Sequence, residues 1–177
     1  MARKLHIGGH EKKEGWEIAD LNASEIVDHV CDASDMTCFQ ENTFDEVYAS
    51  HVLEHFDYLQ TSKVLSEWNR ILKLNGILYI SVPDLKKMGF ILLQKLNLEE
   101  QYYVSRVIYG GHVNKLDYHV AGFTEDIMNF RLSEAKFTNI TFLENLPQLF
   151  NDSSRIEIKG IPISLNVKAS KLNSRPI

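Results

Sequence analysis

The sequence predicts an α/β fold built on an open sheet with helices packed against it. Residues 44–56, FDEVYASHVLEHF, change from the hydrophobic period of a buried strand to that of a helical face at Ser50-His51. Residues 77–82, ILYISV, are continuously apolar or β-favouring, which is typical of a strand buried on both faces. Open α/β sheets bind ligands where strands end and helices begin, so the Ser50-His51 junction is the first candidate for a site.

Size and charge limit the domain organisation and the class of partner. A chain of 177 residues that is 44% hydrophobic supplies one sizeable core, so we expect a single domain over residues 1–177. The formal net charge of −5 argues against a surface for the phosphate backbone, and we expect no nucleic-acid partner. The short length is compatible with a homodimer that completes the binding pocket.

The cysteines and the N-terminus favour a cytoplasmic protein. Cys31 and Cys38 do not form a C-x-x-C pair, so they make neither a zinc knuckle nor a redox motif, and we expect two reduced thiols. No apolar run approaches the roughly twenty residues of a membrane span, and we expect no membrane partner. No signal-peptide core precedes the first predicted strand.

The N-terminal part of the chain predicts a strand over residues 4–7 that runs into Gly8-Gly9. Two glycines at this place let the backbone approach a ligand without an intervening Cβ. Only about ten residues separate the glycine turn from the next strand, which is too few for a full crossover helix. We therefore expect a shortened N-terminal region.

The next two predicted strands, residues 17–21 and 26–31, each lead into an acidic turn. Asp20 can accept hydrogen bonds from both ribose hydroxyls of a nucleoside cofactor, or it can cap the turn-rich stretch that follows, and we favour the ribose. Asp32 and Ala33 close the third strand, and Asp35 can replace Asp32 if the register shifts.

Helical and strand patterns alternate less regularly in the second half of the chain. Apolar spacing predicts a helix over residues 61–72 that stops at Asn75-Gly76. Residues 85–108 are largely helical by composition, and Thr124 can cap a helix over residues 125–135. The remaining predictions are strands at residues 140–143 and 163–169, the second with one solvated face, and a frayed tail at residues 171–177.

In order and spacing these features resemble class I S-adenosylmethionine (SAM) dependent methyltransferases of small molecules, of the type 11 kind. The resemblance rests on the glycine turn, the two acids, HVLEHF and LNGILYISVPD, and it covers about residues 4–171. It implies a doubly wound Rossmann-like sheet, mostly parallel with an antiparallel last strand, in a compact variant. It also implies SAM as cofactor and a small-molecule acceptor, for which we expect a sugar or other metabolite hydroxyl.

The resemblance also implies roles for individual residues. The candidate catalytic bases are four histidines: His112 and His119, expected in the loop that faces the transferred methyl group, and then His51 and His55. Tyr109 and Tyr118 are expected to line the acceptor pocket, under a helical cap insertion at about residues 85–118. The expected cofactor contacts are Gly8, Gly9, His10, Asp20, Leu21, Asp32, Ala33, Ser50 and His51.

Two alternatives stay open at this point. His51, Glu54 and His55 spell H-x-x-E-H, a pattern of zinc hydrolases in which two histidines hold the metal and the glutamate activates water. We expect no metal here, because the pattern directly follows a buried strand and does not lie in the middle of a helix. The altered glycine turn also permits a SAM-binding domain that has lost catalysis and acts as a partner or regulator.

Overall fold

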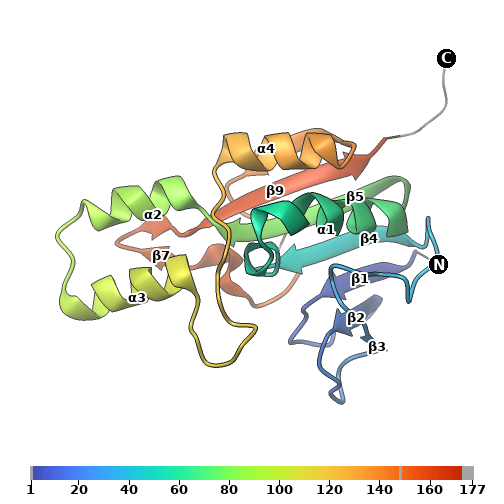
Figure 1. The fold of residues 1–177 in the computed structure, drawn as a ribbon, viewed down its shortest axis with the longest axis horizontal. Coiled ribbons are helices and arrows are strands. Elements are labelled where there is room, and N and C mark those ends of the chain that lie inside the picture. Colours follow the sequence, from blue (N-terminus) through green and yellow to red (C-terminus); the bar gives the residue numbers. More distant parts are fainter. Residues whose placement is uncertain (1, 148, 173–177) are drawn as a thin grey trace.

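A seven-stranded mixed sheet forms the centre of the protein (Figure 1). The computed structural model describes residues 2–147 and 149–172. Strands β1 to β5 pair in parallel, and β9 runs antiparallel to both of its neighbours, β5 and β6, which confirms the predicted open sheet with an antiparallel last strand. In sheet order the strands are β3 (His29–Val30), β2 (Trp16–Asp20), β1 (Lys4–Ile7), β4 (Phe44–Ser50), β5 (Leu72–Pro83), β9 (Ser164–Lys171) and β6 (Phe137–Leu143).

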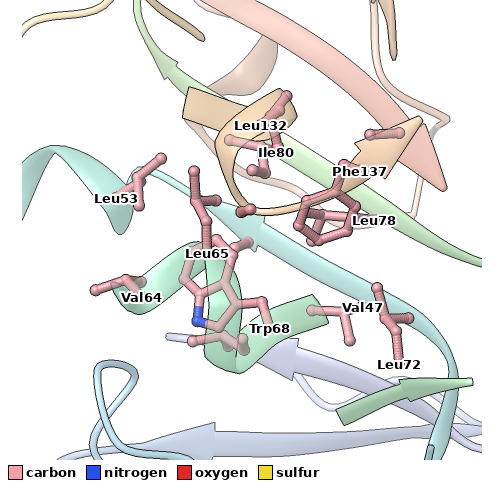
Figure 2. Close-up of a cluster of buried hydrophobic side chains, with 14 of the residues drawn as sticks. Val47, Leu53, Val64, Leu65, Trp68, Leu72, Leu78, Ile80, Leu132 and Phe137 are labelled. Atoms are coloured by element: carbon pink, nitrogen blue, oxygen red, sulfur yellow. The ribbon is translucent and has the colours of Figure 1, made fainter. Parts of the chain in front are cut away.

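Helices α1 (Tyr58–Ile71) and α4 (Glu125–Glu134) lie side by side over one face of the sheet (Figure 1). The Asp57 side chain begins α1 by accepting hydrogen bonds from the Leu59 and Gln60 amides, and Thr124 caps α4 as predicted. Apolar side chains at the helical period of α1 meet alternate side chains of β4 and β5. The resulting core is shown in Figure 2 and includes Val47, Leu53, Val64, Leu65, Trp68, Leu72, Leu78, Ile80, Leu132 and Phe137.

The opposite face of the sheet is covered by an irregular segment, residues 144–147 and 149–156, which contains the short 3-10 helix η2 (Ser153–Arg155). Its Leu146 and Phe150 pack on the aromatic side chains of Trp16, Tyr48 and Tyr79. This segment overturns part of one prediction, since the N-terminal half of β9 has no solvated face: Ser164 and Asn166 are each 1% exposed, and only Lys168 and Ser170 on that face are partly exposed. The buried Asn166 side chain donates hydrogen bonds from Nδ2 to the carbonyls of Glu144 and Ser154, whereas its Oδ1 has no hydrogen-bond partner among the described residues.

Helices α2 (Leu85–Leu92) and α3 (Leu98–Tyr109) extend beyond one end of the sheet (Figure 1). They confirm the predicted helical content of residues 85–108. A capping box between Asn97 and Glu100 starts α3. Both helices pack in a second apolar cluster with the short strands β7 (Glu157–Ile158) and β8 (Ile161–Pro162).

Two predicted element boundaries are wrong. The helix α1 ends at Ile71, and Asn75-Gly76 lies in a bulge of β5, where the register with β4 shifts between Phe44 and Glu46. Asn75 does adopt a positive φ of 62°, but it does so in the bulge and not at a helix end. HVLEHF forms the single 3-10 turn η1 (Leu53–His55), and the regular helix starts only after Asp57.

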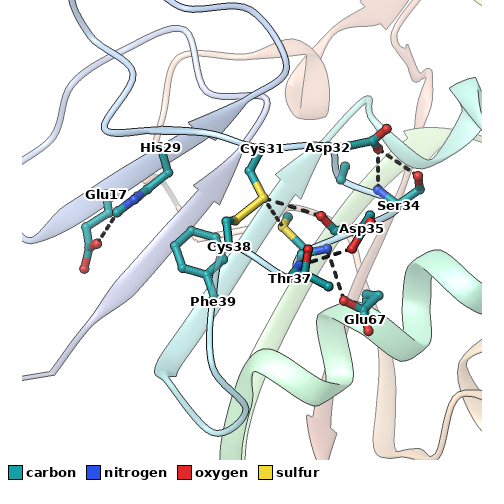
Figure 3. The surroundings of a disulfide bond; sticks show 12 residues. Glu17, His29, Cys31, Asp32, Ser34, Asp35, Thr37, Cys38, Phe39 and Glu67 are labelled. Carbon is teal, nitrogen blue, oxygen red and sulfur yellow. Dashed lines mark hydrogen bonds and ion pairs between the residues drawn. A yellow bond between two sulfur atoms is a disulfide. The ribbon is translucent and has the colours of Figure 1, made fainter.

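The prediction of two reduced cysteines is also wrong, because Cys31 and Cys38 form a disulfide (Figure 3). The bridge closes the turn that follows β3, and this strand is shorter than predicted. Residues 26–28 do not extend it, because the Asp28 carboxylate accepts a hydrogen bond from the Ile18 amide.

Hydrogen bonds from Lys171 hold the C-terminal end of β9 against the end of α1 and the start of β5. Lys171, predicted to begin a frayed tail, is the last residue of β9, and its ammonium donates hydrogen bonds to the carbonyls of Arg70 and Leu72. Residues 173–177 of the predicted tail lie outside the described residues. Within residues 2–147 and 149–172, no helix has the length and apolar character needed to cross a membrane.

A pH-dependent contribution to stability is expected from His6 on β1. Its ring is 4% exposed, packs against Tyr48 and Phe150, and has its pKa lowered to about 4, mainly by burial. Between pH 6.5 and 4 the unfolded chain therefore binds a proton that the folded protein excludes, so stability decreases as the pH falls. From pH 7 to pH 4.5 we expect a loss of about 2 kcal/mol from this residue.

The measurement is urea unfolding of the wild-type protein and His6→Phe at both pH values. Phe keeps the aromatic packing and removes the titration, so the variant should lose less stability than the wild type over this range. Equal losses in the two proteins would show that His6 is not the responsible group.

Candidate functional site

A cavity of about 600 Å³ opens at the carboxyl ends of β1, β2 and β4. Its lining brings together residues predicted from separate strand ends: Gly8, His10, Asp20, Leu21, Asp32, Ala33, His51 and His55. Gly9, Ser50, His112 and His119 are not part of this lining. The cavity thus lies where an open α/β sheet holds its ligands.

The glycine turn after β1 is required by close packing. Gly8 has a φ of +69°, and a Cβ at this position would lie 2.8 Å from the Val52 side chain. A Cβ on Gly9 would lie 2.7 Å from Nδ1 of His6. Both positions therefore exclude larger residues, and the turn keeps its backbone close to the cavity.

The carboxylates of Asp20 and Asp32 each stabilise the turn that follows their strand. Oδ1 of Asp20 accepts a hydrogen bond from the Asn22 amide at 2.7 Å, and Oδ1 of Asp32 accepts from the amide and hydroxyl of Ser34. Both predicted uses of Asp20, turn cap and ligand contact, are therefore compatible, because the residue also lines the cavity. Asp35 instead accepts from the Thr37 amide and is not part of the lining.

A second cavity of about 440 Å³ adjoins the first, and Gly8, His10 and His51 line both. Ser50 and Asp152 belong to this second cavity. The Ser50 hydroxyl is buried and has no hydrogen-bond partner among the described residues, whereas Asp152 accepts a hydrogen bond from the Tyr48 hydroxyl at 2.6 Å.

Three histidines surround a fully buried carboxylate beside the first cavity. Glu54 is 0% exposed, and its Oε1 lies 3.2 Å from Nδ1 of His51 and 3.8 Å from Nε2 of His119. The rings of His55 and His119 meet edge to face with their centroids 4.8 Å apart. Burial favours the neutral acid, but the facing imidazoles, His51 first, outweigh it and hold the pKa of Glu54 below its ordinary value.

His119 reaches this cluster through the backbone of the segment that follows α3. The amides of Val120 and Ala121 both donate hydrogen bonds to the Glu54 carbonyl, which ties residues 119–121 to η1. Burial lowers the pKa of His119, so its neutral imidazole is favoured near neutral pH. His119 thus contacts the ring of His55 but is not itself part of the cavity lining.

His112 has a different setting from the other predicted histidines. Its exposed ring stacks on Tyr118 with a centroid distance of 4.1 Å, and its Nε2 donates a hydrogen bond to the Tyr109 carbonyl at 2.8 Å. Tyr118 lines the cavity, but His112 and Tyr109 do not. The proposed catalytic role of His112 stays a prediction.

Part of the cavity wall was not anticipated from the sequence. Besides the predicted Tyr118, the segment after α3 supplies Val113, Asn114, Lys115, Leu116, Asp117 and Val120 to the lining. Gly110 allows the chain to fold back there: its φ is +90°, and a Cβ would lie 2.3 Å from the Asp117 carbonyl oxygen. The Gly110-Gly111 pair was the available signal for such a turn.

The geometry argues against the zinc-hydrolase alternative. In that mechanism the glutamate of H-x-x-E-H activates a water molecule, which requires access to solvent. Glu54 is completely buried, and the pattern spans a 3-10 turn in which the spacing of a regular helix is absent. The side chains of His51, Glu54, His55 and His119 are close together, but they are not arranged for hydrolysis.

Comparisons with known proteins agree with the sheet topology. Residues 11–80 match the family described as Methyltransferase domain. A SAM-dependent methyltransferase from Archaeoglobus fulgidus is 16% identical, with a TM-score of 0.60 over 96% of this chain and 86% of that one. A 1,6-didemethyltoxoflavin-N1-methyltransferase from Burkholderia thailandensis, solved with S-adenosylhomocysteine, is also 16% identical, with a TM-score of 0.57 over 97% of this chain and 72% of that one.

The CurJ carbon methyltransferase is 15% identical, with a TM-score of 0.60 over 97% of this chain. This chain spans about half of that protein, 49% of its length. No curated protein matches the chain. At such low identities the solved structures show the fold alone, and that fold is the Rossmann-like fold of class I methyltransferases.

Proposed function

We propose that this chain is a SAM-dependent methyltransferase acting on a small-molecule acceptor, because residues 11–80 match a methyltransferase domain and the chain has the class I methyltransferase fold. The observation that carries this proposal is the cavity itself, which joins the glycine turn, both acidic strand ends and the end of β4. Such a cavity offers close backbone approach and carboxylate acceptors to a nucleoside cofactor.

In this proposal SAM lies along the carboxyl edge of the sheet. Its adenosine contacts Asp20, Leu21 and Asp32. The Oδ1 atoms of the two aspartates are engaged in turns, which leaves their Oδ2 atoms available to the cofactor. Its amino-acid half extends to the glycine turn, where the two cavities meet. The remaining proposed cofactor contacts are Gly8, Gly9, His10, Ala33, Ser50 and His51.

The acceptor is proposed to bind at the end of the cavity formed by His51, His55 and Tyr118. The acceptor oxygen forms a bond to the methyl carbon as the carbon–sulfur bond breaks, which leaves S-adenosylhomocysteine. The hydroxyl proton passes to solvent or to a histidine base, for which His51 and His55 lie at this end of the cavity. Holding the two reactants near contact distance is the main gain that a protein supplies to this displacement. A sugar or other metabolite hydroxyl is the acceptor class that we propose.

Further parts of the proposal concern the surroundings of the site. Residues 85–118 are the proposed cap that selects the acceptor; within this range residues 113–118 line the cavity, whereas α2 and α3 do not. The formal charge of −5 disfavours nucleic acid as an acceptor. A homodimer and a cytoplasmic location also remain parts of the proposal.

Replacing Asp20 by Ala is expected to weaken SAM binding at least tenfold, about 1.4 kcal/mol, because the ribose hydroxyls lose their acceptor. The measurement is calorimetric titration of chelator-treated protein with SAM and with S-adenosylhomocysteine. Asp20→Asn is the informative second variant, since its amide oxygen can still cap the turn to Asn22. A loss of affinity in both variants identifies a ligand contact, and a loss in Asp20→Ala alone identifies a turn cap.

Asp35→Ala serves as the control, because Asp35 holds a turn outside the cavity lining and should leave the affinity for SAM unchanged. If wild-type protein binds neither SAM nor S-adenosylhomocysteine, the proposed function is wrong. The alternative of a SAM-binding regulator predicts binding as well. It is separated by transfer of labelled methyl groups to a panel of small hydroxyl acceptors, which a regulator cannot perform.

A further inference from the structure

Glu54 holds a charge for which the described residues offer no direct hydrogen bond. Both of its carboxylate oxygens are buried and lack a hydrogen-bond partner among residues 2–147 and 149–172. The side chain is 0% exposed, so water cannot replace such partners from the bulk. A buried carboxylate without a partner is strongly unfavourable, and its presence needs an explanation.

The hydrogen bonds on the outer sides of His55 and His119 determine which ring nitrogens face this carboxylate. Nδ1 of His55 lies 3.1 Å from the Tyr118 carbonyl, and Nδ1 of His119 lies 2.8 Å from the Val107 carbonyl. A carbonyl can only accept, so both Nδ1 atoms carry the proton. In the neutral rings Nε2 then bears a lone pair, and Nε2 of His119 points toward Oε1 of Glu54.

His51 presents the same arrangement with its nitrogens exchanged. The Ser164 hydroxyl donates to the Ser153 carbonyl at 3.1 Å, so it accepts at 3.0 Å from Nε2 of His51. Nδ1 of His51 is left with a lone pair, and it lies 3.2 Å from Oε1 of Glu54. Thus all three imidazoles donate outward when they are neutral, and two of them then direct an unprotonated nitrogen at the carboxylate, whereas a protonated His51 would instead donate to it.

We propose that Glu54, His55 and His119 bind one divalent transition-metal ion, with His51, whose Nδ1 lies 3.2 Å from Oε1 of Glu54, as an additional candidate ligand. The candidate ligand atoms of Glu54, His55 and His119 all lie within 4.8 Å of one another. An ion with ligands at about 2.1 Å would draw these side chains inward. A histidine that donates its second nitrogen to a carbonyl or hydroxyl is the usual arrangement around protein-bound metals, because it orients the ring and fixes its tautomer.

The donor set indicates the kind of ion. A carboxylate oxygen combined with the imidazole nitrogens of His55 and His119 suits zinc and its transition-metal neighbours better than calcium or magnesium, which prefer oxygen ligands. The competing explanation for the same geometry is a single proton shared between Glu54 and His51. The two explanations differ in whether the protein binds a metal with one-to-one stoichiometry.

The position of the cluster suggests what the ion contributes. His51 and His55 line the cavity, so an ion bound to them lies beside the proposed acceptor end. There it can coordinate an acceptor hydroxyl as an additional ligand and lower the pKa of that hydroxyl, with the imidazoles serving as ligands and not as bases. This contribution rests on the proposed function, whereas metal binding itself does not.

The test uses untagged protein stripped with a chelator and titrated with Zn²⁺ by calorimetry, with Co²⁺ absorption as a reporter of the ligand set. We expect one ion per chain for the wild type and at least 100-fold weaker binding for Glu54→Gln. His55→Ala is the second variant, because its half-buried ring lies at the rim and its removal should leave the fold intact. His55→Ala should weaken Zn²⁺ binding at least 100-fold as well.

The matched control is His112→Ala, which removes an exposed histidine from the same segment as His119 and should leave Zn²⁺ affinity unchanged. Absence of stoichiometric binding in the wild type, or binding that survives both Glu54→Gln and His55→Ala, would overturn the inference. SAM titration of the same metal-free protein keeps the two proposals distinct. SAM binding without metal binding refutes the metal site alone, and metal binding without SAM binding refutes the proposed function alone.

Discussion

Replacing Trp68 by Ala is expected to lower the free energy of unfolding by about 3–5 kcal/mol, the usual loss when a large buried aromatic is removed. Trp68 is 0% exposed and lies in the core between α1 and the sheet (Figure 2). Its indole Nε1 also donates a hydrogen bond to the Ala33 carbonyl at 2.9 Å. The variant therefore loses apolar burial and a tie to the segment that lines the cavity.

Urea unfolding measures this loss, and Leu59→Ala is the control on the same helix. Leu59 is 92% exposed, so its removal should change stability by less than about 0.5 kcal/mol. Trp68→Phe keeps most of the apolar volume and removes the hydrogen bond to Ala33, so it should lose less stability than Trp68→Ala. If Trp68→Ala and Leu59→Ala had similar effects, Trp68 would not be central to the core.

Reduction of the disulfide between Cys31 and Cys38 is expected to cost about 2 kcal/mol of stability. The cysteines are separated by 7 positions, and restriction of the unfolded chain by so short a loop contributes about this amount. The folded loop has other supports: the Arg70 guanidinium donates hydrogen bonds to the carbonyls of Met36 and Phe39. The fold should therefore survive reduction, with the loss arising mainly in the unfolded state.

Urea unfolding with and without a thiol reductant tests this expectation. The double variant Cys31→Ser, Cys38→Ser should match the reduced wild type and should not respond to reductant. Unchanged stability of the wild type after complete reduction, verified by thiol titration, would contradict the prediction. Trapping of free thiols in cells bears on the proposed location, because a cytoplasmic protein normally keeps its cysteines reduced.

The sequence alone was enough to predict the sheet and its ligand edge, because these depend on local patterns. The change of period at Ser50-His51 and the apolar run of β5 reflect which side chains each element must bury. Gly8 and Asp20 were identified at strand ends because turn chemistry is also local. Once the order of parallel strands is known, such ends meet at one edge, and the cavity there was predictable.

Only the tertiary structure determined which distant residues meet. The cover of the second face by Phe150, the bridge between Cys31 and Cys38, and the approach of His119 to Glu54 follow from chain closure. The amides of Val120 and Ala121 donate hydrogen bonds to the Glu54 carbonyl and so place His119, and the hydrophobic pattern of the sequence does not predict these bonds. The sequence therefore determined most of the elements and the sheet edge that carries the cavity, whereas long-range packing determined the cluster of one buried carboxylate and three imidazoles.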